Sequence, residues 1–308
     1  MRTITVGAAQ LGPIQRAEGR DEVVARMCAL LDRAGDAGCD LVVYPELALT
    51  TFFPRWDVSH PGESDQWFED AMPNAATQPL YDNARAHNIA LSFGYAEKTP
   101  DGHYFNTSIL TDREGAEVGK YRKVHLPGHS EYDPARTHQH LEKKYFEPGD
   151  LGFRAWDALG GRLGMCICND RRWPETWRVL GLQGVEMVLL GYNTPVTNSL
   201  SATEVPEHRI FHHKLSVQAG CYQNSCWGVA VAKAGDEDGF PLMAGTIIVD
   251  PQGLVVAETQ TEGDELITHE CDLDRAAFGK KTIFNFAAHR RTEHYGLIVE
   301  RTGEGEPI

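Results

Sequence analysis

RLGMCICNDRRWPE, residues 162–175, passes from an apolar run into a cluster of polar and charged side chains, and a helix is predicted to begin at Pro174. A second apolar run, EMVLLG at 186–191, follows that helix. Strands that alternate with helices are typical of a sheet covered by helices. The stretch therefore predicts an α/β fold, and it places a thiol, an amide, a carboxylate and two guanidinium groups where a strand ends.

The same alternation extends in both directions along the chain. Before this stretch, strands are predicted at 4–8, 41–46, 89–98, 105–112 and 117–123, with an amphipathic helix over 23–34 and another near 78–87. After it, a helix is predicted at about 207–220, with strands at 226–233, 244–250 and 253–259. The pattern predicts a mixed sheet system covered by helices, in a single domain over residues 1–308.

Composition limits the classes of partner. The 308 residues are 42% hydrophobic and 24% charged, and 29 Lys and Arg against 44 Asp and Glu give a net charge of −15. Nucleic acid and membrane surfaces are therefore not expected partners, and an anionic substrate must be held by local cations. The chain has no apolar block typical of a signal peptide or a membrane span, and its seven cysteines are scattered through apolar segments. We expect free thiols and a cytoplasmic protein.

Three strands end directly in a reactive or charged side chain: Glu46, Lys123 and Cys168. Ligand chemistry gathers at the carboxyl ends of strands in α/β sheets, so these residues are expected to converge. Glu46 can take the thiol proton, while Lys123 and the backbone N–H after Cys168 can stabilise negative charge on a substrate oxygen. Taken singly, each residue also fits a turn, a sheet edge or the core. Cys166 is assigned to the core, because only the strand-terminal Cys168 is expected to be partly exposed.

The segments around these residues resemble one family. VVYPELALTTFFPRW (42–56), GKYRKVHLPGH (119–129) and CICNDRRWPETWR (166–178) resemble the three signature regions of the nitrilase superfamily of carbon–nitrogen hydrolases. HQHLEKKYFEPGDLGF (138–153), LGYNTP (190–195) and IFNFAAHRRTEHYGLI (283–298) are similar to segments of the N-carbamoyl-D-amino acid amidohydrolases within that superfamily. The similarity covers nearly the whole chain.

The resemblance implies a four-layer α-β-β-α sandwich and a cysteine-dependent amidohydrolase. Glu46 would be the general base and acid, Lys123 the oxyanion stabiliser and Cys168 the nucleophile, and Glu142 would help to orient the lysine and the substrate. The implied reaction converts an N-carbamoyl-D-amino acid to the D-amino acid, carbon dioxide and ammonia, without a cofactor. A homodimer or homotetramer is implied as well, with contacts through the outer helices and the C-terminal segment at about 272–308.

Two adjacent arginines follow the cysteine. A planar guanidinium matches a carboxylate through two parallel hydrogen bonds, which suits an amino acid substrate. The resemblance favours Arg172 on the α-carboxylate with Arg171 in support, whereas pairing of one arginine with Asp170 or Glu175 is the structural alternative. The other predicted substrate contacts are His140, Asn169, Asn193 and Thr194, and His125 is predicted to support the catalytic loop.

Several alternatives remain at this stage. His125, His129, His138 and His140 are close in sequence, but their spacing is not typical of zinc sites, and we expect no metal. The sequence has neither the phosphate-binding P-loop pattern nor the G-x-S-x-G pattern of serine hydrolases. Asn169-Asp170 after the cysteine differs from the Trp-Glu usual in nitrilases proper. Another carbon–nitrogen hydrolase, acting on β-ureido acids or aliphatic amides, and a non-catalytic binding module of the same fold are the remaining functions.

Overall fold

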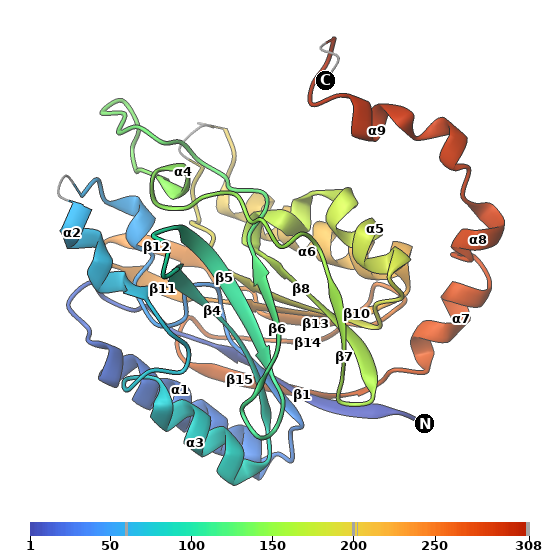
Figure 1. Ribbon diagram of the computed structural model, residues 1–308, viewed down its shortest axis with the longest axis horizontal. Coiled ribbons are helices and arrows are strands. Elements are labelled where there is room, and N and C mark those ends of the chain that lie inside the picture. Colours follow the sequence, from blue (N-terminus) through green and yellow to red (C-terminus); the bar gives the residue numbers. More distant parts are fainter. Residues whose placement is uncertain (59–60, 199–200, 202, 306–308) are drawn as a thin grey trace.

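Two β-sheets lie face to face in the computed structural model, which describes residues 1–58, 61–198, 201 and 203–305 (Figure 1). The first sheet has the order β15-β1-β2-β4-β5-β6, with β3 beside β4. Its strands are β1 (Thr3–Gln10), β2 (Leu41–Val43), β3 (Phe68–Glu69), β4 (Ala90–Lys98), β5 (Tyr104–Thr111), β6 (Glu117–Arg122) and β15 (Glu265–Asp272). The neighbours β1, β2 and β4 run parallel, and the outer pairs β1–β15, β4–β5 and β5–β6 run antiparallel.

The second sheet has the order β14-β13-β10-β9-β8-β7, with a parallel centre at β8, β9 and β10. Its strands are β7 (Ala155–Ala158), β8 (Gly161–Ile167), β9 (Met187–Tyr192), β10 (Trp227–Ala232), β13 (Ile247–Val249) and β14 (Val255–Glu258). A separate hairpin pairs β11 (Ala234–Glu237) with β12 (Phe240–Met243).

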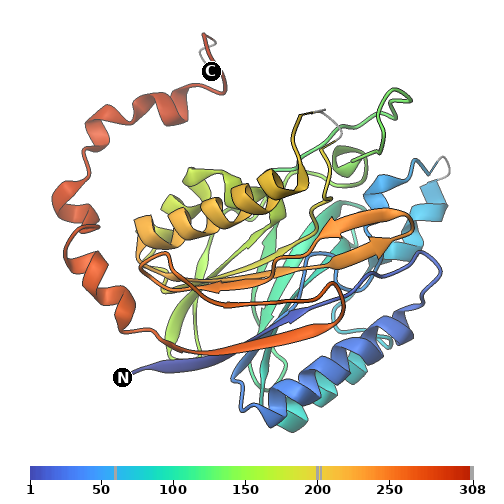
Figure 2. The same ribbon diagram turned by 180° about the vertical axis from the view of Figure 1, so that it is seen from behind.

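Helices cover both outer faces, as Figures 1 and 2 show from opposite sides. Helices α1 (Arg20–Asp36) and α3 (Gln78–His87) cover the first sheet, while α5 (Pro174–Leu182) and α6 (Pro206–Asn224) cover the second. The result is the predicted four-layer α-β-β-α sandwich. Shorter helices are α2 (Pro61–Ser64), α4 (Glu142–Tyr145), α7 (Arg275–Lys281), α8 (Phe286–His289) and α9 (Gly296–Glu300), with 3-10 turns η1 (Phe53–Arg55), η2 (Asp65–Trp67), η3 (Cys168–Arg172) and η4 (Thr292–His294).

Apolar periodicity explains the layers. In α1 the buried side chains recur at helical spacing and pack in one core with α3 and the outer face of the first sheet. A second core joins the inner faces of both sheets to α5 and α6. Its members include Val6 and Val43 of the first sheet, Met165 and Leu190 of the second, and Trp177 of α5. The sheets are therefore held face to face by apolar contacts, which leave their strand ends available for polar groups.

Several predicted strands are shorter in the structure, including all three that were predicted to end in a reactive or charged side chain; β6 ends at Arg122, one residue before Lys123. The strand predicted at 41–46 ends at Val43, because Pro45 has no N–H to donate and Leu47 has a left-handed φ of 46°. The strand predicted to reach Cys168 ends at Ile167, and Cys168 begins η3 with a φ of 47°. Glu46 and Cys168 therefore lie in turns beyond their strands.

Sequence reasoning did not predict β7, the β11–β12 hairpin or β15. Strand β15 pairs with β1 from Thr3↔Asp272 to Gln10↔Glu265, yet most of its side chains are only half-buried. An edge strand with charged residues at many positions lacks the apolar alternation on which such a prediction depends.

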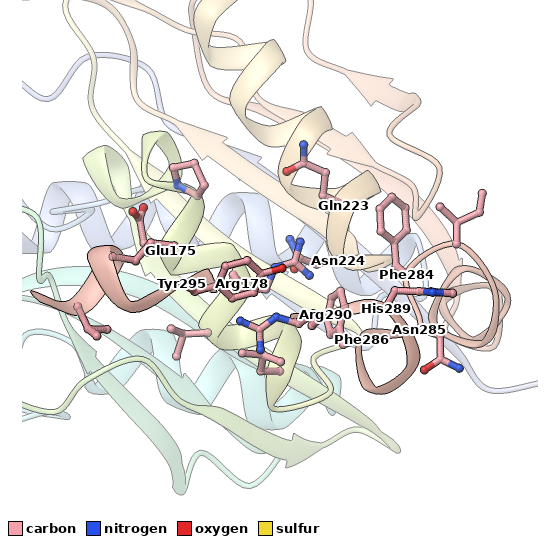
Figure 3. Close-up of a pocket in the computed structure, with 16 residues that line it drawn as sticks. Glu175, Arg178, Gln223, Asn224, Phe284, Asn285, Phe286, His289, Arg290 and Tyr295 are labelled. Atoms are coloured by element: carbon pink, nitrogen blue, oxygen red, sulfur yellow. The ribbon is translucent and has the colours of Figure 1, made fainter. Parts of the chain in front are cut away.

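The C-terminal arm, residues 275–305, leaves the body beside α5 and α6 and extends away from it (Figures 1 and 2). A groove of about 500 Å³ lies between this arm and the two helices (Figure 3). Large apolar side chains on the arm are exposed, namely Phe278, Ile283, Leu297, Ile298 and Val299. Among the described residues, no helix has the length and apolar character needed to span a bilayer.

Candidate active site

Glu46 lies between the two sheets, where a strand from each approaches its backbone. A Cβ atom added to Gly94 of β4 would lie 2.7 Å from the Glu46 Cα, and one added to Gly191 of β9 would lie 2.4 Å from the Glu46 N. Real side chains do not pack this closely, so the two glycines make room for the turn that carries Glu46. The Glu46 side chain is fully buried.

Three donors hold the Glu46 carboxylate. Its Oε1 accepts hydrogen bonds from Asn106 Nδ2 at 2.7 Å and from Lys123 Nζ at 2.6 Å. Its Oε2 accepts the Asn193 backbone N–H at 2.9 Å, and Asn193 Nδ2 donates to the Glu46 carbonyl at 2.9 Å. A carboxylate has about four acceptor positions, so this arrangement fixes the group and still leaves capacity on Oε2 for a proton.

Lys123 follows β6 and is fully buried between two carboxylates. Its Nζ donates to Glu46 Oε1 and to Glu142 Oε2, each at 2.6 Å. Burial acts to lower the pKa of Lys123, but the charges of the Glu142 and Glu46 carboxylates that it contacts act in the opposite direction, and the pKa lies above its usual value. The side chain is therefore an ammonium, and two of its three protons are used by the carboxylates.

Cys168 sits at the start of the turn that follows β8. Its Sγ lies 3.6 Å from the Asn193 carbonyl oxygen, to which it donates. Burial and the Glu46 carboxylate raise the pKa of the thiol, and the positive charges of Lys123 and Arg171 only partly offset this. In the resting protein the group is a neutral thiol beside a carboxylate that can accept its proton.

The expected partial exposure of Cys168 is wrong, because the residue is only 2% exposed. The left-handed backbone of the turn sets the direction of the Cys168 side chain. The alternation of side chains along a strand, which related Cys168 to Cys166 in the sequence analysis, therefore does not apply to Cys168. Cys166 lies in β8 and is buried in the core, as predicted.

Asp170 holds the turn in place, a role that differs from the arginine pairing considered for it from the sequence. The buried carboxylate accepts hydrogen bonds from the Ile167 and His125 backbone N–H groups, both at 3.0 Å. It also accepts from Tyr121 Oη at 2.7 Å and pairs with His125 Nδ1 at 2.8 Å. His125 therefore contacts the turn through Asp170, and these bonds occupy the carboxylate that was considered as a partner for an arginine.

Glu142 and His140 form a second buried layer behind Lys123. His140 Nε2 pairs with Glu142 Oε1 at 2.9 Å, and the His140 ring packs edge-on against Phe52 at 5.3 Å. Burial acts to raise the pKa of Glu142, but Lys123 and His140 more than offset it and hold the pKa below its usual value. Glu142 is therefore an anion that shares Lys123 with Glu46.

A cavity of about 300 Å³ opens in front of Cys168. It is lined by Pro127, Gly128, Arg136, His140, Cys168, Asn169, Arg172, Asn193, Thr194, Pro195, Asn198, Glu204, Arg209 and His212. Five of the six predicted substrate-contacting residues lie in this lining, and the exception is Arg171. Glu46 and Lys123 are buried behind the thiol.

The two adjacent arginines have different surroundings. Arg171 is buried, donates to the Cys168 carbonyl at 2.6 Å and to Thr194 Oγ1 at 3.0 Å, and lies over the ring of Tyr192. Arg172 is exposed at the cavity and donates to Asn169 Oδ1 at 3.2 Å. The neighbouring charge of Arg171 lowers the pKa of Arg172 to about 10, so Arg172 is still a cation at neutral pH.

The four clustered histidines have separate partners. His125 pairs with Asp170, His129 Nε2 with Gln139 Oε1, and His140 with Glu142, while His138 lies beside Thr137. Over the described part of the chain, no group of three or more His, Cys, Asp or Glu side chains is placed to hold a metal ion.

Comparisons with known proteins found similar chains within one family. A family model described as carbon-nitrogen hydrolase matches residues 5–281. The chain is 30% identical to an (R)-stereoselective amidase of a Pseudomonas species, over 80% of this chain and 76% of that one. It is 26% identical to a citrullinase of Francisella tularensis, over 91% and 93%, and 24% identical to an N-carbamoylputrescine amidase of Arabidopsis thaliana, over 91% of each.

Solved structures share the fold. A carbon–nitrogen hydrolase from Helicobacter pylori superposes with a TM-score of 0.81 at 22% identity, over 97% of this chain and 99% of that one. An amidase from a Nesterenkonia species superposes with a TM-score of 0.70 at 21% identity, over 94% of each chain.

Proposed function

Because the chain belongs to the carbon–nitrogen hydrolase family, whose members include amidohydrolases of the nitrilase superfamily, we propose that it hydrolyses N-carbamoyl-D-amino acids with Cys168 as nucleophile. The observation that carries the proposal is the cavity that joins Cys168 to Arg172, with Glu46 and Lys123 behind the thiol. A substrate with a carbonyl at one end and a carboxylate at the other fits this pair of groups.

The first half of the reaction forms a carbamoyl-cysteine. Glu46 accepts the thiol proton as Sγ attacks the ureido carbonyl carbon. Negative charge then develops on the carbonyl oxygen, where the third proton of Lys123 Nζ and the Asn169 backbone N–H stabilise it. Glu46 returns the proton to the α-nitrogen as the carbon–nitrogen bond breaks, and the D-amino acid leaves.

The second half uses water. Glu46 accepts a proton from a water molecule that attacks the carbamoyl carbon, and the same proton returns to sulfur as the carbon–sulfur bond breaks. The product is carbamic acid, which decomposes to carbon dioxide and ammonia. General acid–base assistance of this kind contributes roughly 10²–10⁴-fold in rate.

The remaining cavity residues position the substrate. Arg172 binds the α-carboxylate through its guanidinium. Arg171 braces the Cys168 carbonyl and Thr194, so it acts on the substrate through these groups. Asn193, Thr194, Asn169 and His140 line the cavity and supply polar contacts to the ureido group or the carboxylate.

Selectivity for the D-enantiomer rests on the sequence resemblance described above. Relatives named for N-carbamoylputrescine and for (R)-stereoselectivity support a carbamoyl substrate and a stereoselective site, although each name describes that relative. Arg172 is the feature that favours an acid over an aliphatic amide, which lacks a carboxylate.

The test measures ammonia release from N-carbamoyl-D-alanine, N-carbamoyl-L-alanine, N-carbamoyl-β-alanine and propionamide, because all four substrates give this product. We expect the D-compound to have the highest kcat/KM, and Cys168→Ala to lower it by at least about 10³-fold. Preferred hydrolysis of the β-compound or of propionamide would assign the chain to the corresponding alternative. If none of the four compounds is hydrolysed and none protects Cys168 from alkylation, a non-catalytic binding module would be the remaining function.

We further propose that a second copy of this chain covers the exposed apolar side chains of the C-terminal arm and the groove in Figure 3. Light scattering is expected to give a dimer or tetramer for the full chain and a smaller species after truncation at residue 281. A monomeric full chain would contradict this assembly.

A further inference from the structure

Three arginines line the cavity in front of Cys168, and Glu204 is the one carboxylate in its described lining. Arg136, Arg172 and Arg209 all line it, although the whole chain has a net charge of −15. Arg136 is paired with Asp133 at 3.1 Å. Arg172 is the proposed anchor of the α-carboxylate, which leaves the role of Arg209 open.

Arg209 is held rigidly at the cavity wall. It lies in α6 with a side chain that is 12% exposed, and its Nε donates to the Pro195 carbonyl at 2.7 Å. Its Nη1 donates to Glu204 Oε2 at 3.2 Å. Its Nη2 has no hydrogen-bond partner among the residues that the structure describes. One edge of the guanidinium is thus fixed by the protein, and the other can meet a ligand.

Glu204 orients Arg209 and has little capacity left for other groups. Its Oε2 accepts from both Arg209 and Asn198 Nδ2, the latter at 2.6 Å, and its Oε1 pairs with His212 Nδ1 at 3.2 Å. Burial acts to raise the pKa of Glu204, but these donors offset it and lower the pKa. The carboxylate therefore serves as a fixed anchor for the cation.

Arg209 and Arg172 line the same cavity, and the charge of Arg209 adds to the larger effect of Arg171 in lowering the pKa of Arg172. Two guanidinium groups that face one cavity of about 300 Å³ are stabilised when anions bind between them. A single α-carboxylate satisfies one guanidinium in the two-point geometry.

Most residues in the described lining of the cavity have polar side chains. The described lining has no Leu, Ile, Val, Met, Phe, Tyr or Trp side chain, and its apolar surface comes from Pro127, Gly128, Pro195 and the stems of polar residues. A large apolar substrate side chain would therefore have few partners here, whereas a charged side chain would meet a fixed cation.

We propose that Arg209 is a specificity-determining residue that binds a second carboxylate, so that the preferred substrates are N-carbamoyl derivatives of amino dicarboxylic acids. This inference rests on the proposed function, because it assigns the side chain of the same substrate class. The α-carboxylate is bound by Arg172 and the side-chain carboxylate by Arg209, two residues that line the same cavity.

The experiment compares each acid with its nearly isosteric neutral amide. N-carbamoyl-D-aspartate and N-carbamoyl-D-glutamate are measured against N-carbamoyl-D-asparagine and N-carbamoyl-D-glutamine, with free amino acid separated by chromatography. We expect kcat/KM to be at least about 10-fold higher for the acids, because a charge-assisted hydrogen bond contributes about that much. Arg209→Met should remove the preference, mainly through KM, and change the amides by less than about 3-fold. Arg209→Lys should keep part of the preference for acids over amides.

Two controls separate the outcomes. Arg85→Met in α3, an exposed arginine paired with Asp82, should leave both substrate classes unchanged. Thermal unfolding shows whether Arg209→Met folds. If this variant does not fold, the preference of the wild type for acids over amides and the behaviour of Arg209→Lys test the role of Arg209. Equal kcat/KM for acids and amides in the wild type, or equal losses for both in Arg209→Met, would overturn the role of Arg209. Turnover of the amides in that case would still support the proposed function, whereas turnover of no N-carbamoyl compound would reject both.

Discussion

Replacing Gly191 by alanine tests the claim that two glycines make room for Glu46. The new Cβ would lie 2.4 Å from the Glu46 N and 2.6 Å from the Pro45 carbonyl carbon, whereas ordinary contacts begin at 3.4 Å. One of the two segments must therefore move by about 1 Å. Gly191 does not have a positive φ, so alanine fits the backbone and the effect is one of space alone.

Glu46 is the segment expected to move. Strand β9 is hydrogen-bonded on both sides, with Gly191 opposite Ile167 of β8 and Val231 of β10. A displacement of about 1 Å in a catalytic group costs on the order of 10²-fold in rate, so we expect kcat to fall by about that factor in Gly191→Ala. Overpacking typically costs about 1–3 kcal/mol, which should lower the free energy of unfolding by a similar amount.

The assay combines steady-state kinetics on an N-carbamoyl-D-amino acid with urea unfolding. Gly263→Ala is the matched control, because its added Cβ meets no atom within 4 Å and its φ is not positive. That variant should stay within about 0.5 kcal/mol of the wild type in stability and keep its activity. Unchanged kcat in Gly191→Ala would refute the reasoning. Either Glu46 could then shift without loss of activity, or strand β9 could move instead of Glu46.

Three further variants address the groups behind Cys168. In Glu142→Gln, Lys123 loses a charge that raises its pKa, so kcat should fall and the alkaline limb of the pH–rate profile should move to lower pH; an unmoved limb would contradict this. Asn106→Leu removes a donor to buried Glu46 and should cost about 1–3 kcal/mol in urea unfolding together with activity, and wild-type values would exclude that support. Asp170→Asn should lower Tm and kcat together, whereas retained kcat would separate Asp170 from the Cys168 turn.

The sequence was sufficient to predict which strand ends meet. Glu46, Lys123 and Cys168 are separated by 77 and 45 positions, yet each follows an apolar strand, and the α/β architecture brings such ends to one region. Strand periodicity is a local property, so the central strands of both sheets could be predicted from it. Their lengths could not, because Glu46 and Cys168 sit in left-handed turns that only tertiary contacts stabilise.

The residues that escaped prediction act through long-range hydrogen bonds. Asn106 lies in a predicted strand, and its contact with Glu46 depends on how the β5 strand faces the turn after β2. Asp170 was considered as an arginine partner because of proximity in sequence, but the fold places Tyr121 and His125 nearer to its carboxylate. An amide side chain within a predicted strand was the available signal for Asn106, but Thr107 and Ser108 follow it in the same strand, so the signal did not distinguish it.

The charges around Cys168 explain why the site does not need a stored thiolate. Glu46 raises the pKa of the thiol, which would be unfavourable if the protein had to hold the anion before substrate binds. Moving the proton from sulfur to Glu46, however, only transfers one negative charge between two groups that both lie near Lys123. The field of the ammonium is nearly the same before and after the transfer, and Glu142 keeps Lys123 charged throughout. In the proposed reaction, the proton therefore needs to move only during attack on the carbonyl, when the developing oxyanion takes up the charge.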